Sequence, residues 1–115
     1  MRKSMFVVIA VLAASIAMPA SAGAHAAVTG RTPAPGASLH SVRSIRITFS
    51  ESVVTGKLTV SRSGKKVGTG LLVNHNRGIN ANFTKALSKG TYAVAWSAIA
   101  DDGHRESGTW SFRIV

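Results

Sequence analysis

The pattern of apolar and polar residues along the chain predicts short β-strands. Apolar side chains alternate with polar ones over residues 45–49, 58–60, 79–83, 92–98 and 110–114. A period of two places one face of a strand in a core and the other face in solvent. No window repeats its apolar residues at the spacing of a helix. We therefore expect an all-β fold.

Turn-forming residues separate these stretches. Ser63-Gly64, the polar segment 74–78 and the proline-rich segment 32–36 are examples. The spacing Leu87-x-x-Gly90-x-Tyr92 is typical of a Greek-key corner, at which a buried tyrosine hydroxyl bonds to nearby backbone. The order of strands and turns predicts a small Greek-key β-sandwich or barrel of about seven strands.

The first 24 residues have the parts of a secretory signal peptide in their usual order. A positive Met1-Arg2-Lys3 is followed by an apolar run over residues 5–17 and then by small residues. The run is shorter than the roughly 20 residues of a membrane-spanning helix, which argues against an uncleaved anchor. We predict a signal peptide over residues 1–24 and one exported β domain over residues 25–115.

The cleavage site decides what stands at the front of that domain. Cleavage after Ala24 leaves His25 first, whereas cleavage after Ala22 or after Ala26 satisfies the same rule of small residues and leaves Gly23 or Ala27 first. An N-terminal histidine offers its α-amine and its nearer ring nitrogen to a metal in one chelate. His25 is therefore a candidate metal ligand, and the small-residue rule leaves the three sites open.

Composition excludes several kinds of chemistry. The chain has no cysteine, so disulfides, thiolate metal sites and thiol catalysis are excluded. Of the 14 Lys and Arg, 12 lie after residue 24 and face 4 acidic residues, which gives the exported domain a charge of +8. The basic residues are scattered and several alternate with apolar ones, as on the solvent face of a strand. Such a charge suggests an anionic partner, which could be nucleic acid, lipopolysaccharide or the membrane surface. We assign the charge mainly to solubility and expect no nucleic-acid partner.

Residues 101–108 hold the remaining candidate chemistry, since three of the four acidic residues lie there. We expect a connection of about eight residues, longer than a tight Asp-Gly hairpin, and a loop of that size more often carries a site. Asp102 and His104 are two apart, so in extended backbone they point the same way and form half of a metal site. A Ser107-His104-Asp102 triad is not expected, because no nucleophile elbow accompanies it.

Imidazole suits both zinc and copper, but an amine, an imidazole and a carboxylate in a roughly square plane favour Cu(II). His40 and His75 lie in polar turns and are expected at the surface.

Four segments stand out in order along the chain. They are the opening His25 with the Thr32-Pro33-Ala34-Pro35-Gly36 stretch, then Phe49-Ser50-Glu51, then Gly90-Thr91-Tyr92-x-Val94-x-Trp96, and finally Asp102-x-His104-x-x-x-Gly108 with Phe112. Taken together, these segments resemble the periplasmic copper-binding proteins of the CopC family. They occur in the family's order and spacing over the whole domain.

The resemblance implies a cupredoxin-like or immunoglobulin-like barrel that holds one Cu(II) and is not an enzyme. His25 would supply the amine and a ring nitrogen, His104 a second imidazole and Asp102 an oxygen, with Glu51 as a weaker ligand or nearby acceptor. It also favours cleavage after Ala24. A periplasmic or cell-envelope location and an inner-membrane copper permease of the CopD type as partner are further implications. We also expect a monomer. Metal affinity should fall below a pH of about 6–7 because the nitrogen ligands must lose their protons.

Two departures from the family pattern matter. All three methionines, Met1, Met5 and Met18, lie in the predicted signal, so no methionine site for Cu(I) is expected. Arg105 stands where the family often has proline after the loop histidine, which removes no ligand.

Two rival functions come from other classes. One is a copper-dependent polysaccharide monooxygenase with a histidine brace, which would be larger and carry a broad aromatic face. The other is a metal-free β-sandwich interaction domain, for which replacement of His25 or His104 would leave copper binding unchanged.

Overall fold

The computed structural model describes residues 26–115, apart from the side chains of residues 73–75. The predicted signal peptide and His25 lie outside the described residues. Within them the chain forms strands and no helix, so no helix there could cross a membrane. The predicted all-β fold is confirmed. The six strands are β1 (Val28–Thr32), β2 (Ser38–Leu39), β3 (Ser44–Arg62), β4 (Lys65–Asn82), β5 (Gly90–Ala100) and β6 (Arg105–Ile114).

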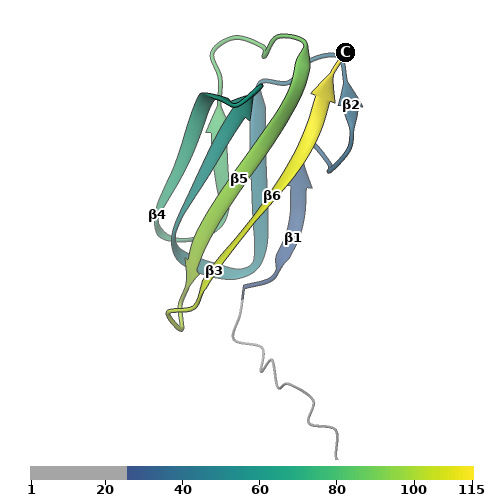
Figure 1. The fold of residues 1–115 in the computed structure, drawn as a ribbon. Coiled ribbons are helices and arrows are strands. Elements are labelled where there is room, and N and C mark those ends of the chain that lie inside the picture. Colours follow the sequence, from purple (N-terminus) through teal and green to yellow (C-terminus); the bar gives the residue numbers. More distant parts are fainter. Residues whose placement is uncertain (1–25) are drawn as a thin grey trace, which may run out of the picture.

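Strand β3 is the strand to which most others attach. Its first half pairs with β1, its second half pairs with β5, and β4 runs antiparallel to both halves. Strand β6 pairs with β5, and the short β2 adds to β6 in parallel. The strands form one sheet that curls so that its two ends face each other (Figure 1).

Two pairs of strands that the sequence predicts as separate are continuous. Residues 45–49 and 58–60 both belong to β3, and most of residues 67–83 belong to β4. The β3–β4 register is irregular between Thr48 and Val53, where both strands bend. Such an irregularity lets a strand turn and twist without ending. The polar segment 74–78, predicted as a turn, therefore lies within a strand. Each of β3 and β4 contributes one half to each of the two layers of the sandwich.

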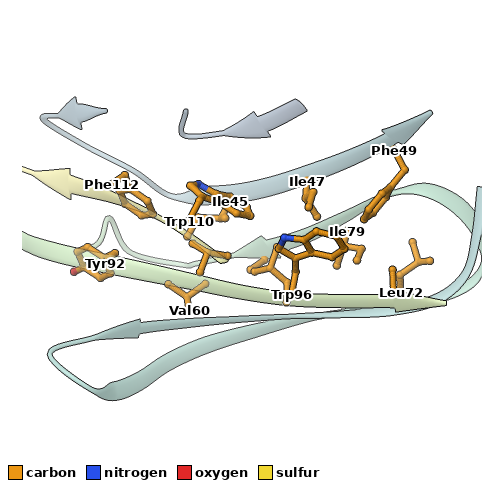
Figure 2. Packing of buried hydrophobic residues seen from close by; sticks show 14 of the residues in the cluster. Ile45, Ile47, Phe49, Val60, Leu72, Ile79, Tyr92, Trp96, Trp110 and Phe112 are labelled. Atoms are coloured by element: carbon orange, nitrogen blue, oxygen red, sulfur yellow. The ribbon is translucent and has the colours of Figure 1, made fainter. Parts of the chain in front are cut away.

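The core lies between the two halves of the curled sheet (Figure 2). Phe49 from the first half of β3 meets Trp96 of β5 edge to face, with ring centroids 5.4 Å apart. Tyr92 stacks on Phe112 at 5.3 Å. The predicted inward faces of residues 92–98 and 110–114 are buried as expected, because their alternation matches the pleat.

The tyrosine corner is also confirmed. The hydroxyl of Tyr92 donates a hydrogen bond of 2.6 Å to the carbonyl oxygen of Ser88. The Arg62 guanidinium donates to the Ser88 hydroxyl and to the carbonyl oxygen of Lys89. These bonds fix the connection between β4 and β5 at the end of the molecule that also holds the C-terminus (Figure 1).

The absence of a side chain at Gly70 lets the two halves of β4 approach each other. A Cβ atom there would collide with the backbone of Asn80 in the other half of the strand. On that side of the sandwich, the backbone at Gly70 therefore packs directly against the backbone at Asn80.

Candidate metal centre

The connection between β5 and β6 is a tight hairpin of residues 101–104. Its bonds run from the Gly103 N–H to the Ala100 oxygen and from the Ala100 N–H to the His104 oxygen, both 2.9 Å long. Gly103 has a φ of 88°, which favours glycine. The prediction of a connection of about eight residues is therefore wrong. Residues 105–108 continue β6, where Glu106 lies opposite Ala98.

Within this hairpin Asp102 holds His104 through both carboxylate oxygens. Oδ1 accepts the backbone N–H of His104 at 3.0 Å, and Oδ2 lies 2.8 Å from Nδ1 of its ring. The two side chains thus converge because a turn folds one onto the other, and not because extended backbone alternates. A carboxylate on one ring nitrogen fixes the orientation of an imidazole and makes the other ring nitrogen, here Nε2, the one that would bind a metal. The His104 side chain is 62% exposed, so a metal could reach it.

The start of β1 is anchored at the same end of the molecule. The Ala27 N–H donates to the Ser50 hydroxyl at 3.0 Å, and the Ser50 N–H donates to the Ala27 oxygen at 2.7 Å. Just beyond, Val53 lies opposite Ala100, the last residue before the hairpin. Figure 1 shows the start of β1 and the hairpin tip at one end of the sheet. Ala26 is 1% exposed and belongs to the core, so packing holds the first described residue in place.

Glu51 is exposed and lies at the bend of β3, next to Ser50. In residues 26–115, no three side chains of the metal-binding types His, Cys, Asp and Glu come close enough to hold an ion together. The structure therefore brings together Asp102 and His104 of the predicted ligands and does not add Glu51 to them. A role for Glu51 stays a prediction.

Glu106 is a residue of this region that the sequence reasoning missed. Its Oε2 atom is buried and has no hydrogen-bond partner among the described residues. It is half-buried on the inward face of β6, in line with Gly108 and Trp110. The alternation of a strand, continued back from Trp110 through Gly108, would have placed Glu106 on the inward face. The signal was missed because neither glycine nor glutamate is a typical core residue.

All four acidic side chains belong to this end of the fold. Asp101 and Asp102 form the hairpin, Glu106 leaves it, and Glu51 lies at the bend of β3. In a strongly basic chain, such a gathering favours the binding of a cation here.

The donors at this end fit Cu(II) or zinc better than Cu(I). They are imidazole nitrogen and carboxylate oxygen, and residues 26–115 contain neither cysteine nor methionine. Nitrogen and oxygen donors suit Cu(II) or zinc, whereas Cu(I) prefers sulfur.

Comparisons with known proteins identify the family of the chain. A family model for the CopC domain matches residues 28–115. Protein YobA of Escherichia coli K12 is 29% identical over 119 residues, covering 97% of this chain and 95% of that protein. Protein YobA of Shigella flexneri matches equally well.

Solved structures share the fold. CopC from Methylosinus trichosporium OB3b superposes with a TM-score of 0.69 at 21% identity, covering 78% of this chain and 93% of that one. PcoC, a methionine-rich copper resistance protein from Escherichia coli, gives 0.66 at 22% identity, with 80% and 100% covered. Because the family model spans most of the sequence, this chain belongs to the CopC family, and its function is related to copper.

Proposed function

We propose that the chain is an exported protein that binds one Cu(II) and sequesters or delivers it in the periplasm or cell envelope. The observation that carries this proposal is the Asp102–His104 pair, in which the carboxylate lies 2.8 Å from Nδ1 of the imidazole. An imidazole oriented in this way is a prepared half of a metal site.

The other half would come from His25. With cleavage after Ala24, its α-amine and nearer ring nitrogen form one chelate. Its neighbour Ala26 is buried at the end of the molecule that carries the hairpin, which supports delivery of His25 to that end. Cleavage after Ala26 would remove this core residue, and cleavage after Ala22 would leave His25 third and without a free amine. The packing of Ala26 thus adds a physical reason against one of the two competing sites.

The oxygen donors have different tasks in this proposal. Asp102 already accepts two hydrogen bonds from His104, so its first task is to orient the ring. Carboxylate oxygens have further lone pairs, so Asp102 can also contact the metal. Glu51 would be a weaker ligand or would accept a hydrogen bond from one. Copper is the cargo of such a site, and no turnover is required.

The protein would hold Cu(II) only. Residues 25–115 lack methionine, in contrast to the methionine-rich PcoC. We further propose that it acts as a monomer and exchanges copper with an inner-membrane permease of the CopD type.

The test is native mass spectrometry of protein exported by a secreting host, after exposure to Cu(II) and desalting. It should show a chain that begins at His25 and retains one copper. His104→Ala should lose the copper, whereas His40→Ala should keep it, because His40 is exposed at the opposite end beside Val115. A His25 chain without copper, or equal loss in both variants, would contradict the proposal.

A further inference from the structure

Six basic residues, scattered along the sequence, gather at the end of the molecule opposite the hairpin, and we call this region the cationic end. The β3–β4 turn and the β4–β5 connection meet there, since Arg62 binds Ser88 and Lys89 through hydrogen bonds. The Phe83 N–H donates to the Arg43 oxygen, which brings the segment before β3 to the same place. The six residues are Arg43, Arg62, Lys65, Lys66, Lys85 and Lys89.

This end carries no acidic side chain, because all four lie at the hairpin end. All six residues except Arg62 are exposed. Arg62 is held by its hydrogen bonds, whereas the lysines have long stems that can reach outward. The molecule is therefore electrically polarised along its strands, with its excess positive charge at one end.

A surface depression of about 350 Å³ lies within the cationic end. Val67, Phe83, Ala86 and Leu87 give it an apolar lining, and Arg62 and Lys85 also line it. Val67 is 40% exposed, so apolar surface reaches solvent among these basic side chains. Charge alone does not explain an apolar depression placed among cations.

We propose that the cationic end docks on the surface of an anionic phospholipid bilayer. A bilayer offers phosphates to the lysines and, just beneath them, an apolar layer for Val67 and its neighbours. Nucleic acid offers phosphates but would use exposed aromatic rings for stacking. Trp96, Trp110 and Tyr92 are buried, and Phe83 in the depression is half-buried. Docking by this end would leave the Asp102–His104 hairpin pointing away from the bilayer.

The experiment is co-sedimentation with vesicles of phosphatidylcholine, with and without phosphatidylglycerol. Lys66→Glu/Lys85→Glu changes two exposed residues of the cationic end. The matched control, Lys57→Glu/Arg77→Glu, makes the same change of charge at exposed positions outside it. All proteins come from the same secreting host, so whatever precedes residue 26 is identical in each. Circular dichroism confirms that the variants fold.

The proposal expects the first variant to bind phosphatidylglycerol vesicles at least about tenfold more weakly than the parent, with the control within about twofold. Equal loss in both variants would show attraction by net charge alone and overturn the proposal. Unchanged binding of the first variant would also overturn it, as would tighter binding to duplex DNA that needs the same lysines.

A second readout tests the orientation. The chain has no cysteine, so an environment-sensitive dye can be attached at Ala86→Cys in the depression or at Arg77→Cys near the bend of β4. With phosphatidylglycerol vesicles, only the dye at residue 86 should shift to the blue. A shift at residue 77 alone, or at both, would contradict docking by the cationic end.

Discussion

The indole of Trp96 lies against the backbone of Gly108, and a Cβ atom at residue 108 would come within 2.8 Å of its Nε1. The ring is 8% exposed and is also held by its edge contact with Phe49, so it has little room to move. A glycine on the inward face of β6 thus makes space for a tryptophan of β5.

Gly108→Ala should therefore destabilise the protein, although alanine usually favours a strand over glycine. We expect a loss of about 1–3 kcal/mol in the free energy of unfolding, measured in urea, because the ring must shift within a packed core. Thr109→Ala, at the exposed neighbouring position, should change it by about 0.5 kcal/mol or less. Equal effects would show that the Trp96 contact carries no special cost.

Asp102→Asn should lower Cu(II) affinity by about 10–100-fold while the hairpin stays folded. The amide oxygen can still accept the backbone N–H of His104, but the charge that orients the imidazole is lost. A competition titration against a chelator measures the affinity, and circular dichroism measures the fold. Unchanged affinity would remove Asp102 from the site.

Glu51→Gln distinguishes the contribution of Glu51 to Cu(II) affinity from that of Asp102. Since Glu51 is exposed and does not join Asp102 and His104, its replacement should cost less affinity than Asp102→Asn in the same titration. A larger loss at residue 51 would make Glu51 the principal oxygen ligand and Asp102 only the residue that orients the ring.

Glu106→Val should stabilise the metal-free protein. The buried Oε2 atom has no partner in the part of the chain that is described, and an unpaired buried polar atom costs about 1–3 kcal/mol. Valine also suits a half-buried strand position opposite Ala98. Urea unfolding provides the measurement. A decrease in stability would mean that the carboxylate finds a partner in solution.

Tyr92→Phe should cost about 1 kcal/mol, because it removes the 2.6 Å hydrogen bond to Ser88 and leaves the ring stacked on Phe112. Copper binding should not change, since this corner lies at the opposite end from the hairpin. A change in affinity would show that the two ends are coupled.

The sequence predicted the inward faces of the strands well, because burial follows a period of two wherever the inward residues are apolar. Tyr92, Trp96, Trp110 and Phe112 all lie where the alternation places them. It failed where the inward residues are small or charged. Glu106 and Gly108 face the interior of β6 but do not look apolar, so the strand was predicted to begin too late and the hairpin to be too long.

Strand continuity was the other failure. Polar residues at the bends of β3 and β4 looked like turns, whereas the register irregularity lets each strand bend and continue into the other layer. Of the candidate site, the Asp102–His104 pair was predicted, but its geometry comes from a turn that only the structure shows. The gathering of basic residues depends on which loops meet in space, so the linear sequence could not reveal it.

The hydrogen bonds between Ala27 and Ser50 have a consequence for when the protein becomes active. They hold the beginning of the domain at the hairpin end, whatever precedes it. Under the proposed function, the α-amine of His25 exists only after the leader has been removed. The precursor inside the cell would thus lack one ligand and could not compete for cytoplasmic copper. Secretion itself would switch the protein on, in the compartment where copper is to be handled.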